Sequence, residues 1–129
     1  MRRRMVAMWT GLIIVAQAFG PPAPDGGQDL TRCTREQNIT REERRAACYR
    51  VTTGKEVLDK KRLAGAYATL AALASGDGDR AAAIHNYDRA IALNPDQPNY
   101  YGLRGFEYHL LGDYDRAFRI RQEFGSPAR

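Results

Sequence analysis

The sequence has few of the residue groupings that catalytic and metal sites need. It contains two histidines, His85 and His109, on different predicted helices and without a cysteine or carboxylate cluster at metal-ligand spacing. A Ser/His/Asp grouping, a glycine-rich phosphate loop and an HExxH motif are all missing from the sequence. We therefore expect no catalytic residue, no cofactor and no metal site, and we predict that the protein is not an enzyme.

Alternating runs of β-branched residues are also missing, so the sequence predicts an all-α fold.

The apolar run from Val6 to Ala16 is shorter than the ~20 residues that span a membrane. Three arginines precede it, and the small-x-small triplet ending at Ala18 follows it, which is typical of a secretory signal over residues 1–18. We expect export to the periplasm, with cleavage after Ala18. An uncleaved signal-anchor that tethers the protein to the inner membrane is the alternative.

The excess of positive charge is small once the signal is set aside. The full chain has 20 basic and 15 acidic residues, a net charge of +5. Without the three signal arginines the net charge is about +2, which is weak evidence for an anionic partner. We therefore expect neither a nucleic acid partner nor a stable membrane span in the mature protein.

Only two cysteines are present, Cys33 and Cys48, and they lie 15 residues apart. Export to an oxidising compartment favours a disulfide between them. Closing a loop of this length stabilises the fold by ~3 kcal/mol on the chain-entropy model. A pair of buried free thiols is the alternative.

The N-terminal part of the mature chain divides into two segments. Residues 19–28 are rich in proline and glycine and are expected to form a disordered linker. Residues 29–60 hold both cysteines and are expected to cap the fold. Within them we predict a helix from Thr40, which opens a capping box with Glu43, to about Thr53, and a short helical turn over residues 29–36.

From residue 61 onward the sequence nearly repeats itself at a spacing of 34 residues. Tyr67 and Tyr101 are one such pair, and four helices are expected between Lys60 and Phe124. A fixed period of this size predicts stacked helical hairpins, which point to binding. The repeating positions are Tyr67, Leu70, Gly78, Ala83, Tyr87, Ala90 and Pro95 in the first copy and Tyr101, Gly105, Tyr108, Gly112 and Ala117 in the second.

The stretches AYATLAALASGDGDRAAAIHNYDRAIALNP and YYGLRGFEYHLLGDYDRAFRI resemble tetratricopeptide repeats (TPRs), of the small exported bacterial type. The resemblance implies a short right-handed solenoid of antiparallel hairpins over residues 61–125, with an N-terminal capping helix before it. Repeat 1 would cover about residues 64–97, and a partial repeat 2 about residues 98–125. The second copy departs from the first at Arg121 and Phe124, where the first has Tyr87 and Ala90.

In this family the first helices of successive hairpins line a concave groove that holds ligand peptides. The resemblance therefore implies a module of the cell envelope that binds a protein or peptide partner without catalysing a reaction. Two alternatives stay open: two hairpins can be too few to form a groove, or the domain is a scaffold fragment that completes its solenoid by homo-oligomerisation. The implied groove residues are Asn99, Gly102, Phe106, His109 and Leu110, with Gly65, Ala68, Ala72, Ser75 and Gly76 in the first copy.

Overall fold

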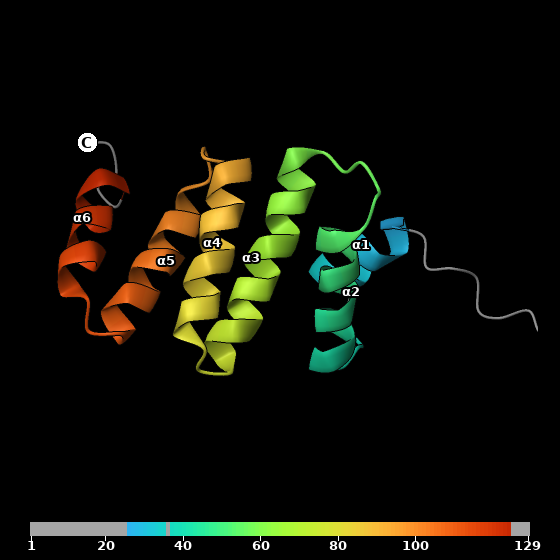
Figure 1. Ribbon diagram of the computed structural model, residues 1–129, viewed down its shortest axis with the longest axis horizontal. Coiled ribbons are helices and arrows are strands. Elements are labelled where there is room, and N and C mark those ends of the chain that lie inside the picture. The colour runs from blue at the N-terminus through green and yellow to red at the C-terminus, as the bar shows by residue number, and fades with distance from the viewer. Residues whose placement is uncertain (1–25, 36, 125–129) are drawn as a thin grey trace, which may run out of the picture.

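The computed structural model describes residues 26–35 and 37–124, which form six α-helices and no strand (Figure 1). The predicted all-α fold class is therefore confirmed. The predicted signal over residues 1–18 and most of the predicted linker lie outside the described residues. The helices are α1 (Gly26–Thr34), α2 (Arg41–Thr53), α3 (Lys60–Gly76), α4 (Arg80–Leu93), α5 (Pro98–Leu110) and α6 (Tyr114–Phe124).

Helix α1 begins earlier than the sequence predicts. Residues 26–28 are helical, which corrects the C-terminal boundary of the linker that we expected over residues 19–28. This early start has a tertiary cause, because α1 is joined to α2 by two interactions. The Asp29 carboxylate is buried and accepts two hydrogen bonds from the Arg50 guanidinium, at 2.8 and 2.6 Å. One turn further on, Cys33 forms the predicted disulfide with Cys48.

Helix α2 begins with the predicted capping box. The Thr40 hydroxyl accepts a hydrogen bond from the Glu43 amide at 3.2 Å, and the Glu43 carboxylate accepts one from the Thr40 amide at 2.8 Å. These bonds satisfy two amides that a helix start otherwise leaves unpaired. Ala47, Cys48 and Val51 are buried on the face of α2 that meets α1 and α3.

The two later hairpins turn through the same local structure, 34 residues apart. Gly78 and Gly112 have φ values of 82° and 80°, a left-handed conformation that glycine adopts without steric cost. The next residue caps the following helix in each case. Asp79 accepts a hydrogen bond from the Ala82 amide at 3.0 Å, and Asp113 accepts one from the Arg116 amide at 3.1 Å.

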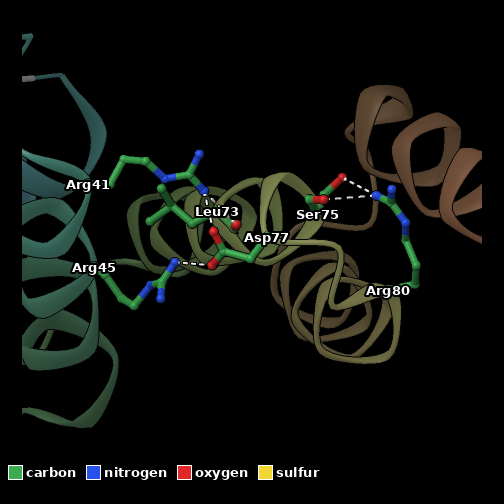
Figure 2. Close-up of polar contacts among 6 residues, drawn as sticks. All are labelled: Arg41, Arg45, Leu73, Ser75, Asp77 and Arg80. Atoms are coloured by element: carbon green, nitrogen blue, oxygen red, sulfur yellow. Dashed lines mark hydrogen bonds and ion pairs between the residues drawn. The ribbon is translucent and has the colours of Figure 1, made fainter.

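Helix α3 is held at its C-terminal end from two sides (Figure 2). On one side, Arg41 of α2 donates hydrogen bonds to the Leu73 carbonyl at 3.0 Å and to the Asp77 carboxylate at 2.7 Å, and Arg45 also pairs with Asp77. On the other side, Arg80 donates to the carbonyl and hydroxyl oxygens of Ser75, at 2.9 and 3.1 Å. The Arg41 and Arg45 contacts join α2 to the first of the two later hairpins, and the Arg80 contacts join the two helices of that hairpin.

The helices follow one another in chain order, from α1 and α2 at one end of the molecule to α6 at the other (Figure 1). Each helix packs against its neighbours in sequence, and α1 also packs against α3. One buried cluster contains Cys33, Cys48 and Leu70 and joins α1, α2 and α3; a second contains Ala71, Ala83 and Tyr87 and joins α3 to α4. The second hairpin, α5 and α6, therefore forms one end of a row of helices.

Candidate protein-binding site

The last hairpin carries most of the exposed apolar surface of the described residues. Nine large hydrophobic side chains are exposed in the described chain. Seven of them lie between Leu103 and Phe124, a stretch that makes up less than half of the described residues. Within α6 only Ile120 is buried. An exposed apolar group of this kind on a small protein indicates a contact surface. Its members are Leu103, Phe106, Leu110, Leu111, Tyr114, Phe118 and Phe124.

A cavity of about 440 Å³ lies between α5 and α6, and we call it the α5–α6 pocket. This volume is within the range of ~300–1,000 Å³ that is usual for binding pockets. The lining residues recur at steps of three and four along each helix, so each helix contributes one face. They are Pro98, Gly102, Gly105, Phe106 and His109 of α5 and Ala117, Ile120, Arg121 and Phe124 of α6.

The depth of the α5–α6 pocket depends on small residues and on one aromatic pair. Gly105 is buried against Ile120, and a Cβ atom placed on it would lie 3.2 Å from Ile120 Cγ2. The absence of a side chain at Gly105 therefore lets α5 and α6 approach closely. At one end, the ring of Phe124 stacks on Tyr101 with a centroid separation of 3.7 Å. This stack fixes Phe124 as a wall of the pocket.

The structure brings together only part of the predicted groove. Gly102, Phe106 and His109 line the α5–α6 pocket, whereas Asn99 and Leu110 are exposed on α5 without lining it. The first-copy groove positions, Gly65, Ala68, Ala72, Ser75 and Gly76, belong to α3 and do not line this pocket.

The wall opposite Phe106 is helix α6, which the groove prediction did not include. The residues of α6 that it missed are Ala117, Ile120, Arg121 and Phe124. The 34-residue period is the sequence signal that could have identified these α6 residues, because it relates each of them to a residue of the first hairpin.

The first hairpin shows what this face looks like when another helix covers it. Subtracting 34 from Arg121 and Phe124 gives Tyr87 and Ala90, which are 2% and 0% exposed. Helix α5 packs against α4, the helix that carries these two residues. In the second hairpin Arg121 is exposed and Phe124 is 43% exposed. The part of the α5–α6 pocket formed by Arg121 and Phe124 is therefore the exposed counterpart of buried positions in the first hairpin.

The polar groups of the α5–α6 pocket are basic or neutral. The His109 ring lies edge-on to the Tyr114 ring, with a centroid separation of 5.1 Å. None of the described lining residues carries a carboxylate. The neighbouring Arg116 is already paired with Asp113 at 2.6 Å. The Arg121 guanidinium has no hydrogen bond or ion pair with any residue of 26–35 or 37–124. It is therefore the cation that this pocket offers to a ligand.

Within the described part of the chain, no group of three or more histidine, cysteine, aspartate or glutamate side chains is placed to hold a metal ion. None of the described helices has the length and apolar character needed to cross a membrane. The chain matches no protein-family model, no curated protein and no solved structure. The resemblance to tetratricopeptide repeats therefore stays a prediction from the sequence.

Proposed function

We propose that this protein is a TPR-like protein-binding module of the cell envelope, which holds a protein or peptide segment against its last helical hairpin. The observation that supports this proposal most directly is the α5–α6 pocket, lined by apolar side chains that the described chain leaves uncovered. No chemical step is part of the proposed function.

Phe106 is the proposed central anchor. Its side chain is 54% exposed and lines the α5–α6 pocket between Gly102 and His109. Full burial of a side chain of this size contributes about 1.5–3 kcal/mol, and binding energy in interfaces concentrates on a few such aromatic residues. Because Phe106 is already nearly half buried, a partner that covers it would gain about half of this contribution.

The proposed location in the cell envelope rests on two features. The sequence of residues 1–18 has the pattern of a secretory signal. The Cys33–Cys48 disulfide, which is fully buried, is of the kind that forms and persists in an oxidising compartment. Both features support export, and they agree with a role in binding other exported proteins.

The test is a crosslinking capture from a periplasmic extract with the mature protein. We expect the Phe106→Ala, His109→Ala double variant to lose the captured partner. Tyr49→Ala is the control, because Tyr49 is an aromatic side chain, 55% exposed on α2, that belongs neither to the exposed apolar group of the last hairpin nor to the lining of the α5–α6 pocket. Unchanged capture by the double variant would contradict the proposal.

Self-association is the second candidate function, and the uncovered face of the second hairpin favours it. A second copy that packs on α5 and α6 would extend the row of helices with its own helices. Sedimentation at increasing concentration separates the two candidates. A mass that rises with concentration, and returns to that of a monomer on Phe106→Ala, supports self-association; a strict monomer excludes it.

A further inference from the structure

Helix α5 shows how a helix docks on a hairpin of this protein. It packs against α4 and buries the Glu107 carboxylate, which is 2% exposed. Glu107 accepts a hydrogen bond from the Ser75 hydroxyl at 2.5 Å and pairs with Arg80 at 3.2 Å. Burial, and secondarily the Glu107 charge, raise the pKa of Tyr87, which places this carboxylate near Tyr87 as well. The first hairpin therefore receives an acidic side chain from the helix that covers it.

The second hairpin offers matching positions to a helix that would cover it. A shift of 34 residues carries Ser75 to His109 and Tyr87 to Arg121, and both of the later residues line the α5–α6 pocket. An imidazole then stands in place of the hydroxyl, and a guanidinium in place of the phenol. Arg80 corresponds to Tyr114, so the basic group moves from the start of the second helix to its third turn.

We propose that the α5–α6 pocket receives an amphipathic α-helix of a partner protein, and that a carboxylate on this helix lies between His109 and Arg121. This inference rests on the proposed protein-binding function and names its partner's chemistry. This carboxylate would contact the second hairpin in the way that the Glu107 carboxylate contacts the first. It pairs with Arg121, whose guanidinium lacks an acidic partner among the described residues.

Charge complementarity favours a partner helix over a second copy of this chain that pairs through the same face. A second copy that pairs through the same face brings Arg121 and His109 but no carboxylate among its described lining residues. Such a pairing leaves the guanidinium without an opposite charge and sets two basic surfaces together. An acidic helix satisfies Arg121 and covers the apolar walls formed by Phe106 and Ile120 in the same step.

The probe for this inference is the helix that already docks on the first hairpin. A peptide with the α5 sequence PNYYGLRGFEYHL contains the Glu107 position as its tenth residue. A hydrocarbon staple between the positions of Asn99 and Leu103, which are exposed in α5, keeps this short peptide helical. A second peptide carries Gln at the tenth position and is otherwise identical. Fluorescence anisotropy with the full mature protein measures Kd for each peptide.

We expect the glutamate peptide to bind about tenfold more tightly than the glutamine peptide, since a hydrogen bond to a charged group is at stake. Arg121→Gln should abolish this difference, and Arg119→Gln should retain it, because Arg119 is exposed on α6 without lining the α5–α6 pocket. Circular dichroism of both variants checks that the fold is intact.

Three results would overturn the inference: equal binding of the two peptides, binding of neither, or a preference that survives Arg121→Gln. A concentration-dependent mass that Phe106→Ala abolishes would also overturn it, in favour of a second copy. The proposed function fails separately, because its own test is Phe106-dependent capture. Equal peptide binding together with Phe106-dependent capture would retain the binding function and reject the acidic helix alone.

Discussion

Gly105 and Ile120 pack so closely that the contact between α5 and α6 depends on the absence of a side chain at residue 105. A Cβ atom there would lie 3.2 Å from Ile120 Cγ2. Alanine stabilises a helix interior by about 1 kcal/mol relative to glycine, whereas overpacking at a close contact costs about 1–3 kcal/mol. We therefore expect Gly105→Ala to lower the free energy of unfolding, measured in urea, by about 1 kcal/mol.

Gly102→Ala is the matched control for this substitution. Gly102 lies one turn earlier in α5, and a Cβ atom on it would have no neighbour within 4 Å. Its substitution should raise the free energy of unfolding through helix propensity alone. Equal stabilisation by both alanines would show that α6 moves away from α5 without cost.

Glu107 supplies a second prediction about stability. Its carboxylate is buried and interacts with Ser75 and Arg80, so Glu107→Gln removes a charge-assisted interaction. We expect a loss of about 2 kcal/mol in the free energy of unfolding, the size of a hydrogen bond to a charged group. Glu123→Gln, at an exposed position of α6, should change it little. A loss no greater than that of Glu123→Gln would show that solvent already screens the pair.

The disulfide predicts a dependence on redox conditions. Cys33 and Cys48 join α1 to α2 and are fully buried. Opening a loop of this length should lower the free energy of unfolding by ~3 kcal/mol. We expect dithiothreitol to produce this loss in the wild type, and to leave the stability of a Cys33→Ala, Cys48→Ala variant unchanged. A wild type whose unfolding curve is the same in both buffers would contradict the prediction.

Acid should weaken the start of α6. A hydrogen bond from the Arg116 backbone amide lowers the pKa of Asp113 below its ordinary value of 3.8. Because the pKa is lower in the folded state, the carboxylate stabilises the fold above its ordinary pKa, and this contribution is lost as the pH falls through the lowered value. Asp113→Asn should flatten the acid limb of a stability–pH curve. Identical acid limbs for the two proteins would show that the cap does not titrate with folding.

Much of the fold could be predicted because its signals are local. The capping box at Thr40, the left-handed glycines 78 and 112 and the capping aspartates 79 and 113 each act within a few residues of themselves. Helix starts near Lys60 and Pro98 follow from the same local chemistry. The start of α1 could not be predicted in this way, because the Asp29–Arg50 pair joins residues that are far apart in the sequence.

The candidate site was harder to predict, because its two walls come from different helices, α5 and α6, that meet at the Gly105–Ile120 contact. The resemblance implies Gly102, Phe106 and His109 as residues of a groove between the first helices, and in the structure they line the α5–α6 pocket. Arg121 and Phe124 appeared only as departures from the first copy. Their role becomes visible once α5 is seen against α4, where the matching positions are buried.

The row of helices has unlike ends, and this gives its unfolding a direction. At the N-terminal end, the Cys33–Cys48 bridge joins α1 to α2 covalently, whereas among the described helices α6 packs mainly on α5. In a stack of nearest-neighbour contacts, each unit opens with a free energy set by its own interfaces. Backbone amides should therefore exchange with deuterium first in α6, then in α5, and last in the middle of the stack. A ligand bound to the α5–α6 pocket would slow the exchange of amides in α6 and α5, and through them in the helices further along the row.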